Sequence, residues 1–84
     1  MRPMKVRLLL FAVLRDITGK SVAELSLADG TRASEVWQTM RRDYPQLAGY
    51  AQPPLIAVNE SYASPDTLLR DGDELAFIPP VAGG

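Results

Sequence analysis

The sequence predicts an α+β fold in which one main helix packs across a small mixed sheet. Three observations lead to this prediction. Near the start of the chain, apolar and charged residues alternate with the period of a strand that has one buried face. A single central stretch repeats its apolar residues at helical spacing. The second half consists of short apolar runs separated by turn residues, which is typical of short strands.

Residues 4–11 are predicted to form the first strand. Every second residue from Val6 to Leu10 is apolar and is expected to face the core. Leu9 and Phe11 are apolar residues on the second face of this strand, so that face is expected to be partly covered as well.

A short helical turn and a second strand follow. Residues 12–18 are expected to form this turn, or a loop, which ends at Gly19 because glycine readily adopts the left-handed conformation after a helix. The second strand is predicted at residues 21–27, again with every second residue apolar, and turn residues at 28–30 close it.

Four residues at helical spacing predict the main helix: Val36, Trp37, Met40 and Tyr44. Its start is open, because Thr31 and Ser34 are both suitable N-caps. Its end is expected at Tyr44, since Pro45 disfavours helical backbone angles in the residue before it. Trp37 is expected to lie in the core.

The rest of the chain is predicted to be a connector and three short strands. Leu47 and Tyr50 are expected to anchor the connector at 46–54, and Thr67-Leu68-Leu69 is expected to form a single helical turn. The strands are predicted at 55–58, 61–63 and 74–78, with turns at 59–60, 64–66 and 70–73. Placing the first and last strands side by side at the centre buries their apolar runs best, which favours the β-grasp (ubiquitin-like) roll. We expect one domain, 1–84, with 79–84 as a flexible functional tail.

Composition excludes several classes of function. The chain has 84 residues and a formal net charge of -1, so a basic nucleic-acid-binding face is not expected. Its apolar runs are too short to span a bilayer and no signal-peptide pattern opens it, which favours a cytoplasmic protein. Without cysteine or histidine it lacks the usual nucleophile, general base and metal ligands. We therefore expect neither a metal site nor an enzyme that acts by itself.

The last residues point to a different chemistry. Pro79 and Pro80 cannot continue a sheet ladder and favour a stiff, extended neck. Six residues from Pro79 to Gly84 can reach roughly 20 Å. Gly83 and Gly84 have no Cβ, so they can enter a narrow slot and leave a terminal carboxylate accessible. The sequence thus predicts a tail that is inserted into another protein.

The ending Phe-Ile-Pro-Pro-Val-Ala-Gly-Gly resembles that of the molybdopterin synthase small-subunit (MoaD) family. The resemblance recurs, in family order and spacing, in Phe-Ala-Val-Leu-Arg-Asp at 11–16, Ala-Val-Asn at 57–59 and Asp-Gly-Asp-Glu at 71–74. It covers nearly the whole chain from Met4. Ala82 stands where Ser or Thr is common, and Arg32 where a helix-capping Thr is common.

The resemblance implies a ubiquitin-like sulfur carrier. In this family an E1-like (MoeB-like) enzyme uses ATP to adenylate the terminal glycine carboxylate, and a sulfur donor converts it to a thiocarboxylate. The large (MoaE-like) subunit then receives the tail, and sulfur passes to cyclic pyranopterin monophosphate to form the molybdopterin dithiolene. The implied state is a hetero-oligomer with no permanently bound cofactor.

Roles follow for individual residues. Gly84 would be the carrier and Gly83 its slender approach, with Val81 and Ala82 filling the channel and Pro79 and Pro80 forming the neck. An apolar docking patch for both partners is expected at Phe11, Leu68 and Phe77, although core packing is an alternative for each of them. Arg15 is a candidate for pairing with a partner's acidic residue, or is simply solvated.

Three alternatives stay open at this stage. One is a sulfur carrier of another pathway, either the ThiS-type carrier for thiamin thiazole or a carrier for a tungsten-pterin cofactor; the proline-rich neck disfavours the thiamin-thiazole carrier. A second is a protein modifier that forms isopeptide bonds with lysines. A third is a passive ubiquitin-like interaction module in which the two glycines are incidental.

Overall fold

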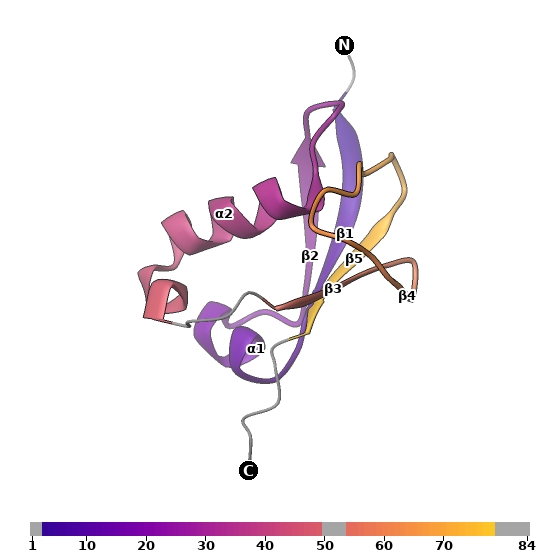
Figure 1. Cartoon of the computed structure of the whole chain (residues 1–84). Coiled ribbons are helices and arrows are strands. Elements are labelled where there is room, and N and C mark those ends of the chain that lie inside the picture. The colour runs from indigo at the N-terminus through magenta and orange to yellow at the C-terminus, as the bar shows by residue number, and fades with distance from the viewer. Residues whose placement is uncertain (1–2, 50–53, 79–84) are drawn as a thin grey trace.

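The computed structural model describes residues 3–49 and 54–78, which form a five-stranded mixed sheet with both α-helices on one side of it (Figure 1). In chain order the elements are β1 (Met4–Leu10), α1 (Ala12–Thr18), β2 (Val22–Leu27), α2 (Ala33–Asp43), the 3-10 helix η1 (Pro45–Gly49), β3 (Leu55–Val58), β4 (Ser61–Tyr62) and β5 (Glu74–Ile78). The strand order is β2-β1-β5-β3-β4.

The predicted pairing of the first and last strands at the sheet centre is confirmed. β1 and β5 run parallel, with Leu8 opposite Leu75 and Leu10 opposite Phe77, whereas the other strand pairs are antiparallel. Each central strand therefore has a neighbour on both sides, and this arrangement suits their nearly continuous apolar runs. The α+β, β-grasp fold predicted from the sequence is the one observed.

The core lies between the inner face of the sheet and α2. Phe77 is fully buried there, and its ring meets the ring of Trp37 edge-on, with a centroid distance of 5.2 Å and an interplanar angle of 63°. Leu47 on η1 is also fully buried, as predicted, whereas Tyr50 lies outside the described residues. Edge-to-face contacts between aromatic rings add to the stability that burial provides.

The N-terminus of α2 differs from the prediction, since neither Thr31 nor Ser34 caps it. The N-cap is Arg32, and the Glu35 carboxylate accepts a hydrogen bond of 2.9 Å from the Arg32 backbone N–H. The Thr31 hydroxyl instead donates to the Ala28 carbonyl in the preceding turn, at 2.6 Å. The helix start is therefore stabilised by a side chain within its first turn, which is half of a capping box.

The single helical turn predicted at residues 67–69 is wrong. This segment lies alongside the start of α2, where Leu68 forms an isolated antiparallel bridge with Arg32. The Thr67 carbonyl accepts from the N–H of Ala33, and the N–H of Leu69 donates to the Thr31 carbonyl, both at 3.0 Å. The backbone groups that a helical turn would have paired internally are used instead to hold α2 in place.

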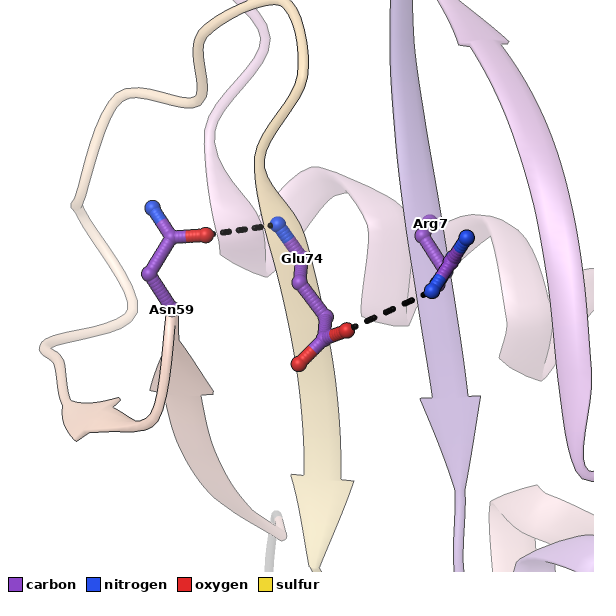
Figure 2. Close-up of polar contacts among 3 residues, drawn as sticks. All are labelled: Arg7, Asn59 and Glu74. Atoms are coloured by element: carbon purple, nitrogen blue, oxygen red, sulfur yellow. Dashed lines mark hydrogen bonds and ion pairs between the residues drawn. The ribbon is translucent and has the colours of Figure 1, made fainter.

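A polar clamp joins the β3–β4 turn to the start of β5 (Figure 2). The Asn59 side-chain oxygen accepts from the Glu74 N–H, and its amide nitrogen donates to the Asp73 carboxylate, both at 2.9 Å. The Asn59 N–H also donates to the Glu74 carbonyl at 2.8 Å. Asn59 has a φ of 52°, which asparagine tolerates better than most residues.

Replacing Asn59 by alanine is therefore expected to destabilise the fold by about 1–2 kcal/mol. Asn59→Ala removes both side-chain hydrogen bonds and places a less tolerant residue at a positive φ. The free energy of unfolding in urea measures the loss. Asn59→Gly is the matched variant, because it keeps the backbone conformation and removes the same bonds. If Asn59→Gly is as stable as the native chain, the clamp contributes nothing.

Candidate functional site

The outer face of the sheet, opposite the helices, carries a continuous apolar row. Strand register places one residue of each strand in this row: Val22, Leu9, Ala76, Ala57 and Tyr62. Tyr62 is 77% exposed and Val22 52% exposed, so the two ends of the row are open to solvent. A row of apolar side chains on an uncovered sheet face is a feature of interaction surfaces.

The row continues toward the end of β5. Leu9, Ala57, Tyr62 and Ala76 line a shallow depression of about 330 Å³ together with Phe11 and Ile78. Phe11 is 46% exposed. We call these six residues the outer apolar face. Two carboxylates, those of Glu60 and Glu74, line the same depression.

A charged row borders the outer apolar face on the side away from the end of β5. Here Arg7 stands opposite Glu24 on β2 and Glu74 on β5. The Arg7 guanidinium lies 3.9 Å from the Glu74 carboxylate, in a partly exposed pair that contributes little to stability (Figure 2). The outer side of the sheet is thus charged toward the start of β1 and apolar toward its end.

The apolar end of the sheet is also the end at which the described chain stops. Because β1 and β5 are parallel, Leu10 and Phe77 are neighbours, and Ile78 ends β5 beside the segment that leads into α1. Ile78 belongs to the outer apolar face and directly precedes Pro79. The described part of the chain therefore ends beside this face.

The predicted docking residues do not form one patch. Phe11 lies on the outer apolar face, and Arg15 is exposed on α1 four positions later. Leu68 is 52% exposed but lies beside Arg32 at the start of α2, near the opposite end of the sheet. Phe77 is buried in the core, so it cannot contribute to an exposed patch. Of the three predicted patch residues, the structure leaves only Phe11 on this face.

Sequence reasoning included only Phe11 of the outer apolar face among the docking residues and missed the others: Leu9, Ala57, Tyr62, Ala76 and Ile78. Once Phe77 is placed inward, the alternation of a strand turns Ala76 and Ile78 outward, as their positions on the outer face show. The sequence contained this alternation, but the unbroken apolar run of β5 did not reveal which face is inner. Tyr62 lies in a strand of two residues, which is too short for a periodic pattern.

The predicted tail residues lie outside the described part of the chain: Pro79, Pro80, Val81, Ala82, Gly83 and Gly84. Within residues 3–49 and 54–78, no group of three or more acidic, cysteine or histidine side chains could hold a metal ion. In the same ranges, no helix is both long and apolar enough to cross a membrane. The Asp71 carboxylate accepts a hydrogen bond from the backbone N–H of Lys5 on β1, and the Asp73 carboxylate accepts one from the backbone N–H of Arg70 in its own turn.

Fold and surface together describe a β-grasp domain with an exposed apolar face beside the end of β5. The ThiS family matches residues 8–84, which is most of the chain. The molybdopterin synthase sulfur carrier subunit of Mycobacterium tuberculosis is 37% identical, over 95% of this chain and 98% of its own length. Its Escherichia coli counterpart is 38% identical, over 94% and 99%. The chain therefore belongs to the ThiS family, and its resemblance to the molybdopterin synthase small subunit is confirmed.

Solved structures agree with this assignment. A putative molybdopterin converting factor subunit 1 from Pyrococcus furiosus superposes with a TM-score of 0.81 at 28% identity, covering 93% of this chain and 99% of that one. A complex of subunits 1 and 2 of the molybdopterin-converting factor from Helicobacter pylori matches with a TM-score of 0.62 at 22% identity, covering 96% of this chain and 100% of that one. The second likeness shows the fold alone.

Proposed function

We propose that this chain is the sulfur carrier subunit of a molybdopterin synthase, with the carboxylate of Gly84 as the carrier. The observation that carries the proposal is the outer apolar face at the end of β5, in a chain whose relatives are sulfur carrier subunits. Docking through this face would bring residues 79–84 to a partner's active site. The sulfur-transfer centre itself would lie on that partner.

The chemistry needs an activation step. A free carboxylate is a poor acyl donor, so an E1-like enzyme would first join the Gly84 carboxylate to AMP from ATP, releasing pyrophosphate. A sulfur donor would then displace AMP and leave a thiocarboxylate. This group stores nucleophilic sulfur without a cysteine, which the chain lacks. On the large subunit the thiocarboxylate sulfur would bond to cyclic pyranopterin monophosphate, and water would then hydrolyse the acyl–sulfur bond, which leaves the sulfur on the substrate and returns Gly84 as a carboxylate.

The intact mass of the chain tests this proposal. After incubation with an E1-like enzyme, ATP and a sulfur source, the mass is expected to increase by the difference between sulfur and oxygen. Omitting ATP is the control. An unchanged mass, with the same activating enzyme working on another carrier, would contradict the proposal.

Substitutions on the outer apolar face test whether it binds the large subunit. Tyr62→Ala is expected to weaken binding to the large subunit about tenfold, because exposed aromatic side chains often dominate interfaces. Calorimetric titration with the large subunit measures this change. Leu68→Ala is the matched control, since Leu68 is also apolar and exposed but lies at the other end of the sheet. If Leu68→Ala weakens binding while Tyr62→Ala does not, the outer apolar face is not the docking surface.

A further inference from the structure

Among residues 3–49 and 54–78, β2 is a free sheet edge of six residues, whereas the opposite edge strand, β4, has only two. The N–H of Leu10 donates to the Ser21 carbonyl at 2.9 Å, so these residues form a hydrogen-bonded pair. In an antiparallel ladder such pairs alternate, so β2 pairs with β1 through the odd-numbered residues that follow Ser21. The N–H and C=O groups of Val22, Glu24 and Ser26 therefore point away from β1, toward the open edge.

An apolar groove lies along this edge, between β2 and α2. Its volume is about 360 Å³, and its apolar lining comes mainly from these two elements, with a floor from β1. The residues that contribute this lining are Ala23, Leu25 and Leu27 from β2, Val36, Met40 and Tyr44 from α2 and its C-cap, and Leu8 and Leu10 from β1. The inner-face residues of β1 are buried, whereas those of β2 are only half-buried. Helix α2 thus covers the centre of the sheet and leaves β2 partly open.

Charged groups are placed at both ends of the groove. Glu35 lines it near the start of α2, and Asp43 lines it at the end of that helix, together with Lys20. The two acidic residues are eight positions apart in the helix, a rise of about 12 Å along its axis. That length corresponds to about four residues of a strand. The groove therefore carries one more negative than positive charge, and its acidic excess lies at the Glu35 end.

We propose that β2 and this groove bind an extended segment of another protein, which adds a sixth strand to the sheet. The segment has aliphatic residues at alternate positions, to fill the groove, and a basic residue at the end that meets Glu35. Main-chain hydrogen bonds to Val22, Glu24 and Ser26 supply affinity, and the groove supplies selectivity. The site is distinct from the outer apolar face, which lies on the other side of the sheet, and does not depend on the sulfur-carrier proposal.

A second copy of the chain fits this edge less well. The antiparallel pairing of two β2 strands with the greatest overlap of open-edge residues sets Glu24 directly opposite its own copy. Two like charges facing each other across a strand pair are destabilising. A basic, aliphatic segment avoids this repulsion and matches the acidic excess of the groove.

Binding of a defined peptide tests the site on the full chain. The probe is Lys-Val-Thr-Val-Thr-Lys with blocked ends, followed by amide chemical shifts of the ¹⁵N-labelled protein. We expect saturable shifts that are largest at Val22, Glu24 and Ser26. A version with glutamate at both ends is expected to bind more weakly, and one with proline in place of its second valine is expected not to bind. No saturable shift at β2, or equal binding of all three peptides, would overturn the proposal.

Two variants with matched controls complete the test. Glu24→Pro removes an N–H from the open edge without removing a bond to β1, and is expected to abolish binding, whereas Glu24→Ala retains it. Glu35→Gln keeps an acceptor for the Arg32 N–H but loses the charge, and is expected to weaken lysine-peptide binding roughly twofold to fivefold. Glu60→Gln, in the β3–β4 turn, is its control. Self-association through β2, seen as concentration-dependent shifts and a dimer in sedimentation, would overturn the choice of occupant.

Discussion

Deleting Gly84 is expected to abolish sulfur loading completely while leaving the fold unchanged. The deletion moves the terminal carboxylate back by one residue, by roughly 3.5 Å in an extended chain, so it no longer reaches the activating site. The fold should persist because removing the last residue leaves β5 and every core residue of the described ranges, 3–49 and 54–78, in place. Intact mass after incubation with the activating enzyme, ATP and a sulfur source gives the readout.

A second tail variant distinguishes the effect of the carboxylate's position from the effect of steric bulk at the last residue. Gly84→Ala keeps a carboxylate at the same position but adds a Cβ beside it, and is expected to slow loading by roughly a hundredfold, as small misplacements at reacting groups often do. Urea unfolding of both variants is expected to match the native chain within about 0.5 kcal/mol. Sulfur incorporation that survives the deletion would show that Gly84 is not the carrier. A passive interaction module would then be the better description.

Periodic patterns in the sequence predicted most of the fold because both the patterns and the fold result from burying one face of each strand or helix. The alternation in β1 follows from burial of one face, and the spacing of Val36, Trp37 and Met40 follows from burial of one side of α2. Pro45 and Gly19 then set helix ends, and the structure places both ends where the sequence predicted them. These features depend on local chemistry, which a sequence contains in full.

Features that depend on contacts between distant segments could not be predicted. The start of α2 is fixed partly by the bridge between Arg32 and Leu68, which are 36 positions apart, and this contact also determines the conformation of residues 67–69. The outer apolar face is likewise a product of register, since Leu9, Ala76, Ala57 and Tyr62 become neighbours only when four strands pair. A single apolar residue per strand gives no pattern along the chain.

The burial of Phe77 also depends on contacts between distant segments, and its substitution is expected to have the largest effect on stability. Phe77→Ala is expected to lower the free energy of unfolding by about 3–5 kcal/mol, because it opens a cavity in the core and removes the ring that meets Trp37. Natural domains are stable by only about 5–15 kcal/mol, so much of this protein's stability would be lost. The urea midpoint measures the change, and Tyr62→Ala, at an exposed position, is the control with little expected effect.

Partner binding decides whether Phe77 acts through the core or through the surface. Phe77→Leu keeps most of the buried volume, so the variant should remain folded and should bind the large subunit as the native chain does. Tyr62→Ala should show the opposite pattern, with native stability and weakened binding. If Phe77→Leu weakens binding as much as Tyr62→Ala while its stability stays native, Phe77 contacts the partner and the buried position seen here opens on docking. Native binding by Phe77→Leu, together with the loss of stability in Phe77→Ala, would assign Phe77 to the core and leave docking to the outer apolar face.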